Sequence, residues 1–179
     1  MKWLIASDLH GSALYTEKLM EAFAAEKAER LLLLGDLLFT GPHVALPDGR
    51  EARRVIDLLN EKKDCIFCVR GNCDAEADAA ALRFHILSDH LFLHDGALPL
   101  FATHGHLYTA LSYPPLEPGT VILQGHTHIP LLEKGAHPRL NPGSVSLPRG
   151  GSRHGYMTLE NGLFLWKTLD GTPYMEFLP

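Results

Sequence analysis

The sequence predicts an α/β protein in which two β-sheets pack face to face with helices outside them. In the first half, apolar runs alternate with amphipathic segments, as in parallel β-α-β units with right-handed crossovers. From Leu91 onward, short apolar runs are separated by Gly, Pro and Asn turns, which is typical of a second, largely antiparallel sheet. Because neither a low-complexity linker nor an internal repeat divides the halves, we expect residues 1–179 to form a single domain.

The first half contains three predicted strands and two predicted helices. The strands are residues 2–7, 30–34 and 65–69, and the helices are residues 13–26 and 51–62. Ser12 is a suitable cap for the first helix, because its hydroxyl can accept a hydrogen bond from a free backbone N–H. The apolar residues of that helix, which we expect to face inward, are Leu14, Leu19, Met20 and Phe23.

The second half contains eight short predicted strands. They are residues 91–94, 99–103, 121–125, 129–134, 144–148, 156–160, 163–168 and 174–178. In the first half, residues 39–50 form a long connection with two prolines and two glycines, so we predict a loop there. Loops of this length close to a site often bind substrate.

Composition excludes several classes of function. The net charge is -5 and no long run of Lys or Arg occurs, so tight binding to duplex nucleic acid is not expected. A small phosphodiester or nucleotide-like substrate remains compatible, because bound cations would offset its charge. No stretch approaches the ~20 apolar residues of a membrane span, and the apolar run near the N-terminus is too short for a signal peptide.

The three cysteines favour a cytoplasmic protein, because their number is odd and no leader segment precedes them. Cys65 and Cys68 form a C-x-x-C pair inside a predicted strand, so we expect both to pack as small apolar residues. The alternative, a redox or zinc-ribbon role, lacks the second C-x-x-C pair that a zinc ribbon requires.

Potential metal ligands recur directly after predicted strands. The five segments are Asp8-Leu9-His10, Gly35-Asp36, Gly71-Asn72-Cys73-Asp74, His104-Gly105-His106 and Gly125-His126-Thr127-His128. Strand ends of an open α/β fold meet at one rim, which is where such folds place their chemistry. The sequence therefore predicts one site with ligands for two metal ions.

The carboxylates of this set have alternative interpretations. Asp8 and His10 are two residues apart at a strand end, so both side chains point to one side and can share a cation. Otherwise Asp8 is a helix-capping carboxylate beside an unrelated histidine. Asp36 follows four leucines and a glycine, and a buried carboxylate needs a partner. Its two oxygens make it the natural bridge between two metals, whereas the simpler interpretation is a turn aspartate.

The remaining ligands are neutral. Asn72 would offer a carbonyl oxygen, although in isolation it reads as a turn residue. His126 and His128 project in the same direction from one strand end, and His104 offers a third imidazole from a neighbouring strand. Imidazole combined with carboxylate suits Zn, Mn, Fe or Ni better than Ca or Mg. The other histidines, which we interpret as exposed or locally satisfied, are His43, His85, His90, His94, His137 and His154.

Taken in this order, the five segments resemble the signature of the calcineurin-like metallophosphoesterases. The runs at residues 46–49, 71–74 and 141–146 are most similar to the small bacterial YfcE-type phosphodiesterases of that family. The resemblance implies a four-layer α/β/β/α sandwich of two mixed sheets. It also implies that one metal binds Asp8, His10, Asp36 and His128, and the other binds Asp36, Asn72, His104 and His126. We expect Mn²⁺, with Zn²⁺, Fe²⁺ or Ni²⁺ as alternatives.

The resemblance predicts hydrolysis of a phosphodiester by a hydroxide that bridges two divalent ions. Most of the superfamily has histidine where this chain has Cys73, and a thiol is a poor proton donor to a leaving group. We therefore expect a preference for diesters with good leaving groups. His106 is predicted to contact phosphate, donate a proton or support a ligand, and Asp74 to orient its neighbours.

Two other functions remain open at the level of sequence. One is a weakly catalytic or non-catalytic interaction scaffold of the same fold, which the complete set of seven ligands disfavours. The other is a phosphomonoesterase or nucleotide phosphatase, which Cys73 disfavours. The sequence leaves open whether the protein forms a homo-oligomer.

Overall fold

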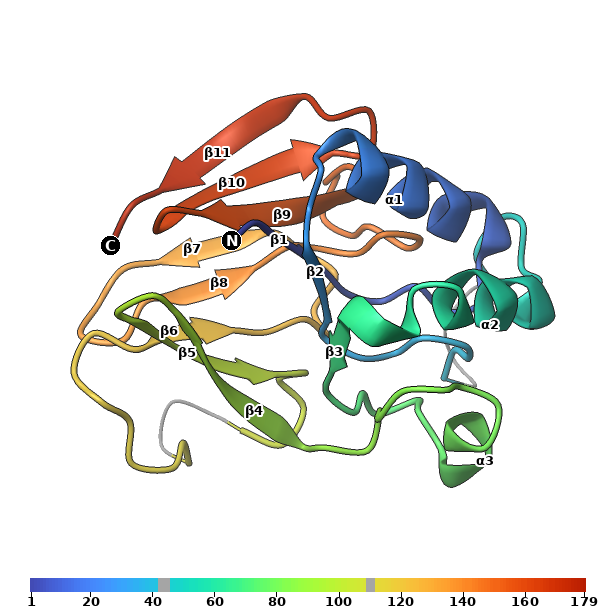
Figure 1. Ribbon diagram of the computed structural model, residues 1–179, viewed down its shortest axis with the longest axis horizontal. Helices are drawn as coiled ribbons and strands as arrows, with labels where there is room; N and C mark the ends of the chain where they lie inside the picture. The colour runs from blue at the N-terminus through green and yellow to red at the C-terminus, as the bar shows by residue number, and fades with distance from the viewer. Residues whose placement is uncertain (42–45, 109–111) are drawn as a thin grey trace.

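Two mixed sheets stacked face to face form the centre of the protein, as shown by a computed structural model that describes residues 1–41, 46–108 and 112–179 (Figure 1). The first sheet has the order β11 (Pro173–Phe177), β10 (Leu163–Thr168), β9 (Gly155–Glu160), β1 (Trp3–Ala6), β2 (Arg30–Leu33) and β3 (Ile66–Cys68). The second has the order β4 (His90–Asp95), β5 (Leu98–Thr103), β6 (Val121–Leu123), β8 (Arg139–Asn141) and β7 (Leu131–Glu133). The predicted fold class, α/β with two mixed sheets, is confirmed.

Two helices cover the outer face of the first sheet. They are α1 (Ala13–Ala25) and α2 (Ala52–Asn60), and a 3₁₀ turn, η1 (Lys63–Cys65), follows α2. Ser12 caps α1 as predicted, because its Oγ accepts a hydrogen bond from the N–H of Tyr15 at 3.3 Å. Leu19 and Phe23 are buried, but Leu14 is 41% exposed, so the prediction that Leu14 faces inward is wrong.

Alternation along β1 produces two cores. Leu4 and Ala6 point to the helices, where they pack in one cluster with Leu19 and other residues of α1 and α2. Trp3 and Ile5 point the other way and pack with the inner face of the second sheet. Since successive side chains of a strand face opposite sides, β1 is apolar along its whole length.

Aromatic side chains cover the outer face of the second sheet. Phe101 is fully buried there, and the rings of Tyr108 and Tyr113 pack edge-on against it at centroid distances of 5.5 and 5.8 Å. In the described parts of the chain this layer is formed by the connection between β5 and β6 rather than by a helix. A short helix, α3 (Glu76–Ala79), lies between β3 and β4.

The prediction that the second half forms a separate, largely antiparallel sheet is wrong. Strands β9, β10 and β11 extend the first sheet, with β9 antiparallel to β1. In the second sheet, β5 and β8 both run parallel to β6, while the β4–β5 and β7–β8 pairs are antiparallel. Pairing between β1 and β9 joins segments about 150 residues apart, which local sequence patterns do not reveal.

Two strand predictions also need correction. Residues 144–148 form no strand, because their polar groups hydrogen bond to the turn after β1 instead of to a sheet neighbour. Strand β8 was not predicted, since its three residues lie between Pro138 and Pro142 and form too short an apolar run.

The long connection after β2 is described only in part. Residues 42–45, which include His43, lie outside the described residues, so the predicted loop at 39–50 and the interpretation of His43 are untested there. Its last part is anchored to the start of α1, where the Oγ of Ser12 donates a hydrogen bond to the carbonyl of Asp48 at 2.6 Å. Among the described residues, no helix is long and apolar enough to cross a membrane.

Candidate metal centre

All five predicted ligand segments meet at one rim of the two stacked sheets. Three of them follow the carboxyl ends of the parallel strands β1, β2 and β3, and two follow β5 and β6 in the facing sheet. Five of the side chains are almost completely buried, namely Asp8, His10, Asp36, His104 and His128. Asn72 and His126 are exposed and close the site towards solvent.

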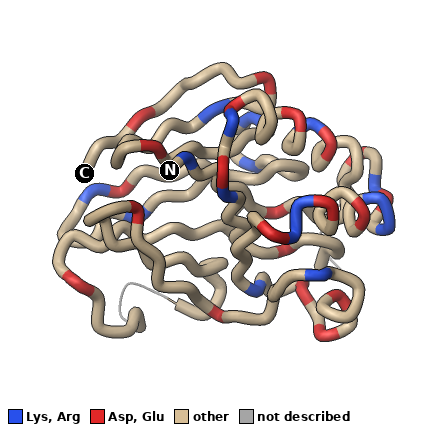
Figure 2. The backbone as a smooth tube through the Cα atoms, viewed as in Figure 1, with Lys and Arg blue, Asp and Glu red and all other residues tan. Residues whose placement is uncertain are grey.

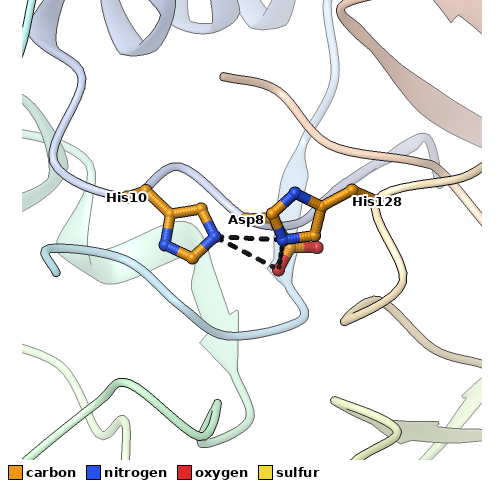
Figure 3. A group of neighbouring side chains, drawn as sticks. All are labelled: Asp8, His10 and His128. Carbon is orange, nitrogen blue, oxygen red and sulfur yellow. Dashed lines mark hydrogen bonds and ion pairs between the residues drawn. The ribbon is translucent and has the colours of Figure 1, made fainter. Parts of the chain in front are cut away.

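Asp8, His10 and His128 converge on one point (Figure 3). The Nε2 atoms of the two histidines are 3.2 Å apart, and Oδ1 of Asp8 lies 3.3 Å from Nε2 of His128 and 3.7 Å from Nε2 of His10. The other oxygen of Asp8 accepts a hydrogen bond from the N–H of His126 at 3.2 Å. Oδ1 is buried and has no hydrogen-bond partner within the described residues, so a cation bound at this point would compensate its charge.

Backbone carbonyls fix which nitrogen of each imidazole faces this point. Nδ1 of His10 donates to the carbonyl of Phe39 at 2.7 Å, and Nδ1 of His128 donates to that of Leu147 at 2.7 Å. In the neutral rings, both Nε2 atoms therefore carry lone pairs that face each other. Two lone pairs at 3.2 Å repel unless a proton or a metal ion lies between them.

A second set of groups lies on the other side of Asp36. Oδ2 of Asp36 is 3.5 Å from Nε2 of His104 and 3.8 Å from Nε2 of His10, so this carboxylate stands between the two sets. Oδ1 of Asn72 lies 3.0 Å from Nε2 of His104 and 2.8 Å from Nδ1 of His126. Nδ1 of His104 donates to the carbonyl of Leu34 at 2.6 Å, which again leaves Nε2 as an acceptor in the neutral ring. An acceptor nitrogen facing an acceptor oxygen also favours a cation.

Asp36 and His104 lie close enough for their charges to shift each other's pKa. Burial raises the pKa of Asp36, but hydrogen bonding and charge from His104 outweigh it, and the pKa falls to about 2. Burial likewise lowers the pKa of His104, yet Asp36 and Asp8 raise it to about 9. Without a metal, a proton on His104 thus compensates part of the buried negative charge.

The backbone is strained where these side chains are attached. Positive φ angles occur at Asp8 (59°), His10 (48°), Asp36 (57°), His126 (69°) and His128 (62°). Outside the site, only Lys27 and Asn161 share this conformation among the described residues other than glycine. Such a conformation costs of order 1–3 kcal/mol per residue and tends to cluster at functional sites.

Asp74 supports the turn that carries Asp36. Its Oδ2 accepts hydrogen bonds from the N–H groups of Asp36 (2.8 Å) and Gly71 (2.7 Å), and its Oδ1 accepts one from Leu37 (2.8 Å). Gly71 must be glycine, because a Cβ there would lie 2.1 Å from Oδ1 of Asp36. The contacts agree with the predicted orienting role of Asp74.

Residues 141–146 support the opposite side of the centre. The side-chain amide of Asn141 donates to the carbonyl of Gly125 at 2.7 Å and to Oγ1 of Thr127 at 3.1 Å. The hydroxyls of Ser144 and Ser146 both donate to the carbonyl of Asp8, at 2.8 and 3.0 Å. This segment therefore holds the turns after β1 and β6 together.

Cys73 and His106, the two less defined candidates, lie beside the centre. The thiol of Cys73 is close to ligand atoms of His10 and Asp36, and burial together with the charge of Asp36 raises its pKa to about 12. His106 has its ring 5.3 Å from that of His104, and its buried Nδ1 has no hydrogen-bond partner among the described residues. Burial and the charge of His104 lower the pKa of His106.

Arg70 forms an ion pair with Asp89 at 2.6 Å. The three cysteines are free thiols, and Cys68 is buried as predicted, while Cys65 is only half-buried.

A pocket of about 470 Å³ opens over the centre. Its walls are His10, Asp36, Gly41, Asn72, Cys73, His126, Thr127, His128 and Arg149. The sequence interpretation missed Thr127 and Arg149. Thr127 lies between two predicted ligands, and Arg149 precedes a Gly-Gly pair just after residues 141–146, so proximity along the chain was the available signal.

Comparison with known proteins agrees with this geometry. The model of the calcineurin-like phosphoesterase superfamily domain matches residues 1–162. Phosphodiesterase YfcE of Escherichia coli strain K12 is 43% identical over 162 residues, which cover 90% of this chain and 88% of YfcE.

Solved structures give the same relationship. The structure of YfcE, described as a phosphoesterase from E. coli, has a TM-score of 0.95 at 39% identity and covers 99% of both chains. More distant matches share the fold. An archaeal phosphodiesterase has a TM-score of 0.63 at 22% identity over the whole of both chains. Vps29 of Chaetomium thermophilum has a TM-score of 0.64 at 17% identity over 99% of this chain and 97% of its own.

Proposed function

The chain belongs to the calcineurin-like phosphoesterase superfamily, and we propose that it is a metal-dependent phosphodiesterase with a dinuclear centre at the rim described above. The observation that carries this proposal is the pairing of acceptor atoms. Nε2 of His10 faces Nε2 of His128 on one side of Asp36, and Nε2 of His104 faces Oδ1 of Asn72 on the other. Each pair is stabilised by a positive charge between its members, which a proton supplies in the metal-free protein and a metal ion would supply in the proposed centre.

The proposed ligands divide into two sets that share one carboxylate. The first set is Asp8, His10, Asp36 and His128, and the second is Asp36, Asn72, His104 and His126. The unpartnered Oδ1 of Asp8 and the strained backbone at five of these residues support it. Both sets combine imidazole with oxygen ligands, which suits Mn²⁺, Zn²⁺, Fe²⁺ or Ni²⁺. Of these, the family resemblance makes Mn²⁺ the expected ion.

Two bound divalent cations would supply a hydroxide nucleophile at neutral pH and offset the charge of the phosphate. The residues of the chain then have distinct tasks. Asp36 holds the two sets at a fixed separation, and the carbonyls of Phe39, Leu34 and Leu147 keep the imidazoles oriented. The open pocket admits a phosphodiester of small or nucleotide-like size.

Among the described residues, the proposed site lacks a strong acid that could protonate the leaving group. The thiol of Cys73 holds its proton tightly, and its pKa of about 12 makes it a poor acid. His106 borders the second set, with its ring 5.3 Å from that of His104, so it is the better candidate for contact with the phosphate. We therefore expect diesters with good leaving groups to react faster than the matching monoesters.

The test begins with elemental analysis of the purified protein. The metal-free protein is then assayed with added Mn²⁺, Zn²⁺, Fe²⁺ or Mg²⁺ on an aryl phosphodiester and on the corresponding monoester. We expect two metal ions per chain and faster turnover of the diester. One ion per chain would contradict the dinuclear centre, and faster turnover of the monoester would contradict the substrate preference.

Asp36→Ala provides the matched variant, because it removes the shared ligand. We expect loss of both ions and of activity. Glu17→Gln is the control, since Glu17 pairs with Arg54 at the surface. Full activity of Asp36→Ala would refute the bridging role.

We also propose that residues 1–179 act as one domain, because the two sheets share a core and the relatives named above match most of the chain. We propose the cytoplasm as its location, because its three cysteines are free thiols. Along the backbone drawn in Figure 2, Lys and Arg are interspersed with Asp and Glu. This mixture of charges supports the expectation that the protein does not bind duplex nucleic acid stably. Sedimentation of the metal-loaded protein would determine whether it forms a homo-oligomer.

A further inference from the structure

Arg149 lines the pocket above the candidate metal centre, and its charge has no partner among the residues that the structure describes. It is the only Lys or Arg among the described residues that form the pocket walls. Its guanidinium makes no hydrogen bond or ion pair to another side chain in residues 1–41, 46–108 and 112–179, and the residue is exposed. A cation in this position is available to bind an anion that enters the pocket.

The backbone of Arg149 is fixed relative to the centre. Its N–H donates to the carbonyl of His128 at 3.1 Å, so the residue is attached directly to a proposed ligand. Ser152 closes the turn from the other side, because its hydroxyl donates to the carbonyl of Arg149 at 2.6 Å. Gly150 and Gly151 have φ angles of +63° and +73°, which make this tight turn possible. The cation thus borders the pocket from a turn that hydrogen bonds hold in place.

We propose that Arg149 is a substrate-binding residue that pairs with a phosphate oxygen of the substrate; this rests on the proposed function. Guanidinium groups bind phosphate oxygens through two parallel hydrogen bonds, and such charge-assisted pairs are stronger than neutral ones. The oxygen belongs either to the scissile phosphate or to a second phosphate joined to it. The pocket volume of about 470 Å³ leaves room for either.

The test compares Mn²⁺-loaded wild type, Arg149→Gln and Arg149→Ala. Glutamine keeps much of the stem but not the charge. The control is Arg153→Ala, because Arg153 belongs to the same loop but lines a separate hollow with Tyr15 and His154. Two readouts are measured for each protein. They are kcat/KM on a diaryl phosphate and on a diaryl diphosphate, and the affinity for inorganic phosphate from thermal shifts.

We expect both Arg149 variants to lose about 10- to 100-fold in kcat/KM and a comparable factor in phosphate affinity. Metal content and metal-loaded Tm should be unchanged, which a merely structural role would not predict. Equal losses on both substrates assign the scissile phosphate, and a larger loss on the diphosphate assigns the second one. Arg153→Ala should behave as wild type.

The inference is overturned if both Arg149 variants stay within twofold of wild type, if Arg153→Ala loses as much, or if metal-loaded wild type binds no phosphate. Failure of the proposed function looks different. In that case wild type hydrolyses neither substrate, while its phosphate affinity still depends on Arg149.

Discussion

At the scale of single residues, the site depends on which ring nitrogen of each histidine carries the hydrogen atom. Three imidazoles donate Nδ1–H to backbone carbonyls, so in the neutral rings their Nε2 atoms are acceptors that face the centre. The sequence predicted the identities of His10, His104 and His128 but not these carbonyl partners, because Phe39, Leu34 and Leu147 carry no chemical signal in their side chains.

Asp74→Asn tests how far the centre depends on its support. Asparagine keeps one acceptor oxygen but turns an NH₂ group towards backbone N–H groups that need an acceptor. We expect metal affinity to fall about 10- to 100-fold, measured by competition with a chromogenic chelator. Glu17→Gln serves as the surface control, and unchanged affinity in Asp74→Asn would show that Asp36 needs no such support.

At the scale of elements, local patterns predicted the first half better than the second. Strands β1, β2 and β3 and helices α1 and α2 have apolar patterns that identify them within one or two residues. Strand β8 was missed because three residues between prolines carry too little pattern. The assignment of β9–β11 to the first sheet depends on contacts between distant parts of the chain, which hydrophobic periodicity does not encode.

One ion-pair cluster connects the C-terminal end of α1 to the first sheet and gives a test by pH. The carboxylate of Glu26 contacts Lys2 at 2.8 Å, Lys167 at 2.6 Å and the hydroxyl of Tyr156 at 2.9 Å. Burial raises the pKa of Glu26, but hydrogen bonds from Lys167, Lys2 and Tyr156 lower it from 4.5 to about 2. The charged carboxylate of Glu26 therefore stabilises the fold above pH 4.5, and this contribution disappears as pH falls towards 2.

Glu26→Gln should accordingly lower the free energy of unfolding by about 2 kcal/mol at pH 7. Urea titrations at pH 7, 5 and 3 would measure the difference from wild type, which we expect to shrink at the lowest pH. Glu21→Gln on the exposed face of α1 is the matched control. A difference that grows below pH 4 would contradict the assigned pKa.

At the scale of the whole molecule, the sequence predicted which residues meet at the rim of the two sheets but not the pocket wall at Arg149. The seven proposed ligands were identifiable because each follows an apolar run, and the two stacked sheets bring those runs to one edge. The pocket wall at Arg149 depends on a turn without such a pattern. Its position follows from hydrogen bonds to His128 and from two left-handed glycines, neither of which a sequence pattern specifies.

Metal binding should change the stability of the whole fold. At a free Mn²⁺ concentration 100 times the Kd, one bound ion stabilises the native state by about 2.7 kcal/mol. For a chain of this size we expect each bound ion to raise Tm by about 5–10 °C, and a chelator to reverse the rise. Calorimetry would measure the shift, and Asp36→Ala should lack it. An equal rise in that variant would place the binding elsewhere.

The left-handed backbone at five proposed ligands implies a trade-off between activity and stability. Each of these residues holds a conformation that glycine adopts without cost and a side chain with a Cβ does not. His126 is exposed and can be exchanged with little loss of packing. We expect metal-free His126→Gly to be about 1 kcal/mol more stable than His126→Ala, as urea titration would show, although both lose the same ligand. If the two are equally stable, that position stores no strain. If His126→Gly is the more stable variant, selection for thermostability alone would favour the loss of such ligands.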